Sequence, residues 1–143
     1  MFIGEYQHNL DEKGRLQIPV KFRSKLSDGA VITRGLDSCL FLYTKEEWQK
    51  IAEKVSALPM SNPKARSFSR LLLAGAMEVE FDKTGRIVIP AFLRQYAGLS
   101  KSAVLAGLWG KIEIWSEDKW REYQHNAEKQ AEENISELED LGI

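Results

Sequence analysis

Alternating apolar and polar residues predict strands over much of the chain. Residues 77–81 show the pattern most clearly, because Met77, Val79 and Phe81 fall on one face and two glutamates fall on the other. Residues 5–10 form a comparable strand near the start of the chain. Four further strands are predicted at residues 30–33, 39–43, 103–106 and 111–115. These segments favour an α+β fold whose core is mainly β.

Helical periodicity follows two of these strands. Thr44 opens a capping box, and the apolar face of the helix behind it comprises Trp48, Ile51, Ala52 and Val55. Ser116 begins the equivalent helix later in the chain, with acidic residues in its first turn, where the helix dipole favours them. The same succession of strand and helix therefore occurs twice.

A connector at residues 58–63 joins the two parts of the chain. Asn62 and Pro63 mark the start of a helix there, and Gly75 marks its end. The buried stripe of this helix is predicted to comprise Ala65, Phe68, Leu71 and Leu72.

A nine-residue segment is repeated, since residues 11–19, DEKGRLQIP, return at residues 82–90 as DKTGRIVIP. Six positions coincide in register when the match is extended to the next arginine: Asp11/Asp82, Gly14/Gly85, Arg15/Arg86, Ile18/Ile89, Pro19/Pro90 and Arg23/Arg94. With a slip of one residue the match continues downstream as far as Trp48 and Trp120. Agreement over this length indicates a duplicated module.

Each copy of this motif predicts a tight turn between two strands. Asp11 and Asp82 suit the first turn position, where a carboxylate accepts hydrogen bonds from backbone amides ahead of it. Gly14 and Gly85 suit a position that needs a permissive backbone. Because the strand resumes after the glycine, each motif is predicted to be a hairpin whose tip carries an arginine.

A short helix is predicted after each motif, with proline at its first position, where the missing N–H costs nothing. These helices span residues 19–26 and 90–97, and Gly98 closes the second.

Length and composition limit the class of protein. A chain of 143 residues with 43% hydrophobic and 29% charged residues is typical of a globular protein. The duplication predicts two small halves that share a core. We expect a first half at residues 1–57, a connector and helix at 58–75, a second half at 76–120 and an acidic C-terminal helix at 121–143.

Three absences predict a cytoplasmic location. No apolar run approaches the roughly 20 residues that a membrane span needs, so no membrane partner is expected. The start of the chain lacks a secretion signal. Cys39 is the single cysteine, so that an internal disulfide cannot form.

Charge is segregated along the chain, although the formal net charge is only −1. Residues 1–34 include six basic and four acidic residues, and residues 60–101 include seven basic and three acidic residues. Residues 117–143 carry nine acidic and three basic residues. The repeated motifs are therefore net basic and the tail is acidic. One helix is predicted to run from Glu117 toward Leu141, with a narrow apolar line of Ile135, Leu138 and Leu141.

No arrangement of residues predicts catalysis. His8 and His125 lack the spacing of a metal pair, Cys39 has no base close in sequence, and neither a Gly-x-Ser-x-Gly nor a Walker-type motif occurs. Cys39, Trp48 and Trp120 are expected in the core. We therefore expect no enzyme activity, no cofactor and no metal.

Arg15 and Arg86 carry the functional prediction. In one interpretation, each pairs with the aspartate four residues earlier and only fixes the turn, although exposed ion pairs stabilise little. In the other, the aspartate orients an arginine that reaches a partner. The planar guanidinium can contact O6 and N7 of guanine together or clamp a phosphate, which suits nucleic acid. Spacing alone leaves the two interpretations equal.

Together these features resemble the MraZ family of bacterial transcriptional regulators, which are built from two AbrB-type DNA-binding modules. The resemblance spans the chain from Phe2 to about Trp120. It rests on the paired Asp-x-x-Gly-Arg-x-x-x-Pro segments, the opening Phe2-x-Gly4, the pair Phe22-Arg23, and the stretch from Gly35-Leu36 to Trp48.

The resemblance implies a tandem AbrB/MraZ-like swapped-hairpin β-barrel with peripheral helices and a C-terminal helix. It implies a ring-shaped homo-oligomer, associated with the nucleoid, that binds double-stranded DNA at short, G-rich direct repeats and represses its own division and cell-wall operon. The DNA-facing residues would be Asp11, Lys13, Arg15, Asp82, Lys83 and Arg86. Thr84 stands where the first copy has Lys13, so phosphate contacts there could differ between the halves.

Basic residues on the helices after the prolines are expected to touch phosphates or to form solvated faces: Lys21, Arg23, Lys25 and Arg94. Of these, Arg23 and Arg94 are included among the predicted DNA-binding residues. The alternative is a protein-interaction module, antitoxin-like or a scaffold, that keeps an AbrB-type barrel and occupies a partner with its acidic tail. A purely structural ring is a third interpretation.

Overall fold

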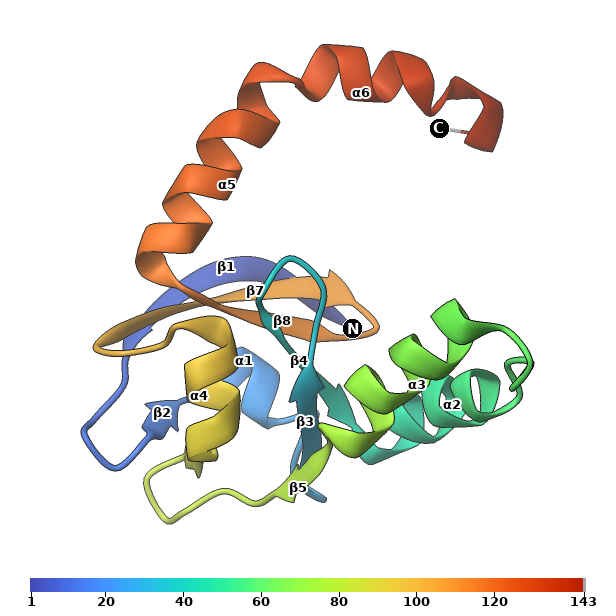
Figure 1. Ribbon diagram of the computed structural model, residues 1–143. Coiled ribbons are helices and arrows are strands. Elements are labelled where there is room, and N and C mark those ends of the chain that lie inside the picture. Colours follow the sequence, from blue (N-terminus) through green and yellow to red (C-terminus); the bar gives the residue numbers. More distant parts are fainter. Residues whose placement is uncertain (143) are drawn as a thin grey trace.

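The computed structural model describes residues 1–142, which form a six-stranded sheet, a two-stranded ribbon and surrounding helices (Figure 1). The sheet is antiparallel and open, and its strands lie in the order β1 (Phe2–Asn9), β7 (Ser102–Trp109), β8 (Ile112–Ser116), β4 (Leu40–Thr44), β3 (Ala30–Arg34) and β5 (Met77–Val79). The ribbon pairs β2 (Arg15–Gln17) with β6 (Arg86–Val88). The α+β class is therefore confirmed.

Strand pairing interleaves the two repeats. The first strand of the chain, β1, pairs with β7 of the second repeat, with Phe2 opposite Trp109, and β5 of the second repeat pairs with β3 of the first. In the ribbon, Leu16 of the first repeat lies opposite Ile87 of the second. Because strands this short cannot bury an apolar face alone, the repeats build one sheet and one core together.

The repeated motif does not form the predicted local hairpin. Within each copy the two arms meet next to the turn, where the Asp11 amide donates to the Arg15 carbonyl at 3.1 Å beside the bridge between Leu10 and Leu16, and the Asp82 amide donates to the Arg86 carbonyl at 2.9 Å. The arm after the turn then pairs with the other repeat. Arg15 begins β2, and the tip of the turn is formed by Glu12 and Lys13. The physical reason is burial, because pairing across the repeats places Leu16 and Ile87 at 0% exposure.

The main core fills the space between the ribbon and one face of the sheet. Ribbon residues and the isoleucines that follow them are fully buried against sheet residues: Leu16, Ile18, Ile87, Ile89, Leu40, Leu42, Leu105 and Ile114. Two short helices add further apolar side chains, Phe22 from α1 (Val20–Arg23) and Leu93 from α4 (Ala91–Ala97).

These two helices differ from their predictions at the first residue. Pro19 and Pro90 occupy the N-cap, with ψ of 141° and 148°, and not the first helical position, because their backbone is still extended. The first helix also ends at Arg23, earlier than predicted. Gly98 closes the second in the left-handed conformation, as predicted.

A second core covers the opposite face of β4 and β8. Phe41, Tyr43 and Trp115 are buried there with Cys39, beneath α2 (Lys45–Ser56), α3 (Pro63–Ala74) and α5 (Glu117–Lys129). Trp48 and Trp120 pack against this cluster from equivalent helices, as predicted. Because both faces of β4 are buried, its first four residues, Leu40 to Tyr43, are large aliphatic or aromatic residues.

The helix starts agree with their sequence signals. The Thr44 hydroxyl accepts from the Glu47 amide at 3.0 Å, and the Asn62 side chain accepts from the Lys64 amide at 2.9 Å. Of the predicted stripe on α3, Leu72 is buried and the remaining three residues are partly buried.

Two predictions for the periphery are wrong. Met77 is 43% exposed instead of sharing the buried face of Val79, because β5 is an edge strand. The C-terminal helix is interrupted at Gln130, after which α6 (Ala131–Glu137) and a 3-10 turn η1 (Glu139–Leu141) follow. Figure 1 shows α5 and α6 reaching away from the sheet, and no residue of α6 is buried. Since no residue of α6 is buried, tertiary packing does not stabilise one continuous helix there.

The line of Ile135, Leu138 and Leu141 is exposed on this tail. In the part of the chain that the structure describes, no helix is long and apolar enough to cross a membrane.

Candidate nucleic-acid interface

Two loops with the same internal hydrogen bonds carry the predicted site; we call residues 11–15 and 82–86 the arginine loops. The Asp11 carboxylate accepts from the backbone amide of Arg15 at 2.9 Å, and the Asp82 carboxylate accepts from that of Arg86 at 2.9 Å. A further amide, of Lys13 or Thr84, donates to the same oxygen. The predicted role of aspartate in the turn is confirmed.

Each loop arginine is also held by its side chain. Arg15 Nε lies 2.6 Å from Asp11 Oδ2, and Arg86 Nε lies 3.0 Å from Asp82 Oδ2. About a third of each arginine side chain is exposed, 35% for Arg15 and 31% for Arg86. The aspartates therefore fix the orientation of two guanidinium groups that still reach solvent.

The ribbon brings the two arginine loops together. Arg15 lies opposite Val88 and Arg86 lies opposite Gln17, so that the arginines occupy the two ends of a three-pair ribbon. Arg86 Nη1 is 3.7 Å from Asp11 Oδ2, which places the Asp11 carboxylate near both arginines. The result is one surface to which each repeat contributes an arginine and the aspartate that holds it.

Hydrogen bonds keep both loop carboxylates ionised. The backbone amide of Arg86, followed by the Thr84 hydroxyl and amide, lowers the pKa of Asp82 to about 2. The backbone amide of Arg15, followed by its guanidinium, lowers the pKa of Asp11. Each aspartate thus balances its own arginine at neutral pH. In the first loop the exposed Glu12 also offsets Lys13, so that the net positive charge of the two loops comes from Lys83 in the second.

The basic residues that follow the prolines occupy two different environments. Lys21 and Lys25 are exposed, as expected of a solvated face. Arg23 and Arg94 are only partly exposed, and the Nε atom of each is buried without a hydrogen-bond partner among the described residues. A fully solvated side chain does not describe these two arginines, because each packs against the loop glycine of the other repeat.

The sequence did not predict the contacts of two residues at the site, Gln17 and Thr84. The Gln17 side-chain amide donates to the backbone carbonyl of Thr84 at 3.0 Å, which ties β2 to the second arginine loop. The Thr84 hydroxyl donates to Asp82 at 2.9 Å. Gln17 corresponds to Val88, and Thr84 to Lys13. Both residues stand at positions where the two copies of the motif differ, and this difference is the sequence feature that could have pointed to them.

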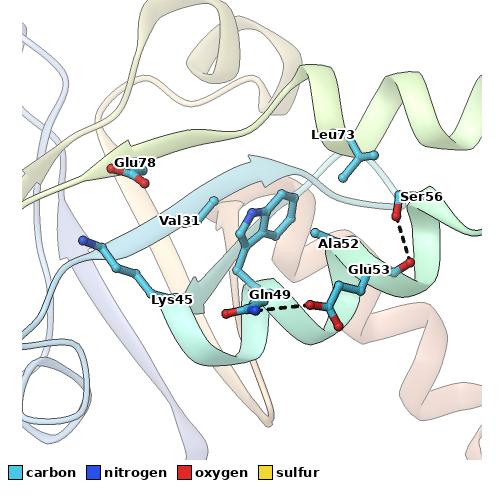
Figure 2. A pocket seen from close by; sticks show the side chains of 9 residues that line it. Val31, Lys45, Gln49, Ala52, Glu53, Ser56, Leu73 and Glu78 are labelled. Atoms are coloured by element: carbon cyan, nitrogen blue, oxygen red, sulfur yellow. Dashed lines mark hydrogen bonds between the residues drawn. The ribbon is translucent and has the colours of Figure 1, made fainter.

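A cavity elsewhere on the molecule contains none of the predicted site residues. It measures about 460 Å³ and lies between α2 and the strands β3 and β5, with Trp48, Lys45 and Glu78 among its lining (Figure 2). Within residues 1–142, no group of three or more His, Cys, Asp or Glu side chains is placed to hold a metal ion. The Cys39 thiol is buried, which raises its pKa and keeps it protonated at neutral pH.

Comparison with known proteins agrees with the duplication. The model of the MraZ protein family, described as antitoxin-like, matches the chain twice, at residues 1–71 and 72–140. The second match begins 71 residues after the first, which is also the offset between Asp11 and Asp82.

Relatives cover the chain completely. A "Transcriptional regulator MraZ" of Halothermothrix orenii is 52% identical over 143 residues, the full length of both chains. Proteins with the same name from Syntrophomonas wolfei and Natranaerobius thermophilus are each 48% identical over 143 residues, again over the full length of both chains. With two family matches and full-length relatives at this identity, the chain belongs to the MraZ family.

Proposed function

We propose that this protein is a transcriptional regulator that binds double-stranded DNA through its two arginine loops. The observation that carries the proposal is the pair of equivalent arginines, each held by an aspartate and each about one-third exposed, on one ribbon built by both repeats. The names of its relatives support the same class.

Guanine is the base that this geometry suits best. The ion pair at Nε fixes the plane of each guanidinium, so that little side-chain entropy is lost on binding. The terminal nitrogens of Arg15 and Arg86 can then donate to O6 and N7 of one guanine in the major groove. Lys13 and Lys83 are exposed beside them and are proposed to contact phosphates.

The ribbon covers the core side of the open sheet, which supports an AbrB-type swapped-hairpin barrel closed by side chains. We further propose a ring of protomers in the nucleoid that engages successive G-rich repeats and represses its own operon. One protomer then binds weakly, and affinity depends on how many loops engage together.

A titration on DNA from the region upstream of its own gene tests the proposal. Arg15→Ala and Arg86→Ala should each weaken binding about tenfold, because a bidentate guanine contact is lost. Arg121→Ala is the matched control, since Arg121 forms an ion pair with Glu117 at 2.6 Å on α5 with the same four-residue spacing. Its affinity should be unchanged. Full affinity in both loop variants would overturn direct recognition by these arginines.

A protein-interaction module is the second candidate. The exposed apolar line on the acidic tail, Ile135, Leu138 and Leu141, and the antitoxin-like description of the family favour it. Co-purification with a small basic protein, together with no retention of DNA, would replace the regulator with this function.

A further inference from the structure

We infer that Arg23 and Arg94 are positioning residues, each bracing the arginine loop of the opposite repeat. The inference rests on the proposed function of the loops, and it gives these two residues a role other than the predicted phosphate contact. It predicts crossed coupling, in which the first repeat shapes the second loop and the second repeat shapes the first.

Close packing of guanidinium groups against the loop glycines is the first observation. A Cβ added to Gly85 would overlap Nη1 of Arg23 and lie 2.5 Å from its Cζ. A Cβ added to Gly14 would lie 2.8 Å from both Cζ and Nε of Arg94. Both glycines have a positive φ, 83° for Gly14 and 81° for Gly85. The absence of a side chain therefore serves both the turn and the approach of the opposite arginine.

Backbone hydrogen bonds hold the same glycines from the same repeat. The Gly85 carbonyl accepts from the Ile18 amide at 3.1 Å, and the Gly14 carbonyl accepts from the Ile89 amide at 2.8 Å. Ile18 and Arg23 belong to one segment, joined by the proline that opens α1. Each loop glycine is therefore held at its carbonyl and covered at its Cα by one segment of the other repeat.

The electrostatics of Arg23 and Arg94 argue against a role in stability alone. Among residues 1–142 neither guanidinium has an ion-pair partner, and each Nε is buried without a hydrogen bond. Withdrawing a cation from water without a carboxylate is unfavourable. We therefore infer that these two guanidinium groups keep the adjacent loop in shape and add positive charge beside Arg15 and Arg86.

Amide spectra of the free, full-length protein test the bracing without DNA. Arg23→Ala should shift the amide resonances of residues 82–86 and leave residues 11–15 in place, and Arg94→Ala should do the reverse. The exposed Lys21 and Gln95 lie on the same two helices, so Lys21→Ala and Gln95→Ala serve as controls that should move neither loop. Shifts confined to the loop of the same repeat, or to neither loop, would overturn the inference.

Lysine variants separate bracing from simple phosphate contact, and they also serve if an alanine variant fails to fold. Arg23→Lys keeps the charge but loses the planar group that covers Gly85. We expect it to shift residues 82–86 and to weaken DNA binding about as much as alanine does. Full affinity with an undisturbed second loop would instead identify Arg23 as a phosphate contact and overturn the bracing role.

A double-mutant cycle on DNA gives the functional readout. Arg23→Ala should weaken binding about fivefold alone and by the same factor in the Arg15→Ala background, but it should add little to Arg86→Ala. Additivity in both backgrounds would contradict crossed coupling. If the unmodified protein does not bind operator DNA, the proposed function fails, whereas the amide spectra still decide whether the loops are braced across the repeats.

Discussion

The guanidinium of Arg86 lies 3.7 Å from the carboxylate of Asp11, although these residues belong to different repeats. Asp11 also holds Arg15 at 2.6 Å, whereas among residues 1–142 Asp82 forms an ion pair with Arg86 alone. The duplicated motif is therefore not symmetric in use, because the first carboxylate serves the arginines of both loops. This asymmetry makes the two aspartates distinguishable by experiment.

Replacing Asp11 should impair DNA binding more than replacing Asp82. Asp11→Asn keeps an oxygen that accepts from the backbone amides but releases both arginines, so we expect a loss of affinity about threefold greater than for Asp82→Asn. Parallel titrations of the two variants on one operator fragment give the comparison. An equal loss of affinity in the two variants, or a greater loss in Asp82→Asn, would show that the contact between Asp11 and Arg86 does not contribute to DNA binding.

The second loop should loosen in acid. The pKa of Asp82 is lowered to about 2 in the folded protein, and an unfolded aspartate titrates near about pH 4. Its stabilising contribution is therefore complete above about pH 4 and is lost as the pH falls toward 2. The amide resonances of Thr84 and Arg86 should stay constant down to pH 4 and shift below it.

Asp82→Asn supplies the control for this acid transition. It should abolish the transition in residues 82–86 and preserve the corresponding one in residues 11–15, where the pKa of Asp11 is also lowered. A loop transition centred above about pH 5 would be inconsistent with these pKa shifts.

Alanine at a loop glycine should be more harmful than alanine at a comparable glycine elsewhere. Gly98 has a φ of 65° and faces the flexible end of Lys119, so Gly98→Ala should cost about 1 kcal/mol of unfolding free energy. Gly85→Ala has the same unfavourable backbone conformation and also displaces Arg23, so it should lower the free energy of unfolding by about 2–4 kcal/mol. Urea denaturation measures both changes.

The same experiment contains its own check. Arg23→Ala removes the obstacle, so it should recover part of the stability lost in Gly85→Ala and recover none in Gly98→Ala. Equal costs for the two glycine variants would mean that Arg23 moves aside freely.

The shared core should unfold as one unit. Ile87 is 0% exposed between the ribbon and the sheet, so Ile87→Ala should lower the unfolding free energy by about 3 kcal/mol. Val88, next to Ile87, is 54% exposed, and Val88→Ala should change the unfolding free energy by less than about 0.5 kcal/mol. Thermal unfolding of both variants should show one transition. Two separate transitions would indicate that the repeats are stable independently.

Features set by neighbouring residues agree with the sequence predictions more often than features that depend on distant parts of the chain. The turn aspartates, the caps at Thr44 and Asn62 and the buried Cys39 are confirmed. The paired arms of a local hairpin, the arginine at its tip and the continuous C-terminal helix are wrong. The half boundaries and the DNA-binding assignments stay predictions.

The confirmed predictions are those that depend on interactions between residues close in sequence. A turn carboxylate, a helix cap or an alternating strand depends on groups within about four residues, so the residue types alone determine it. The repetition of the motif was visible for the same reason, and with it the two arginines and their aspartates.

Tertiary structure alone decided which repeat each strand and each arginine serves. Residues 15–17 could pair along their length with the preceding strand of their own repeat or with residues 86–88, and Arg23 could face solvent or Gly85, without any change in the local pattern. The choice was made by burial, because crossing the repeats encloses both ribbon strands in one core, whereas short hairpins would have left their apolar faces in water.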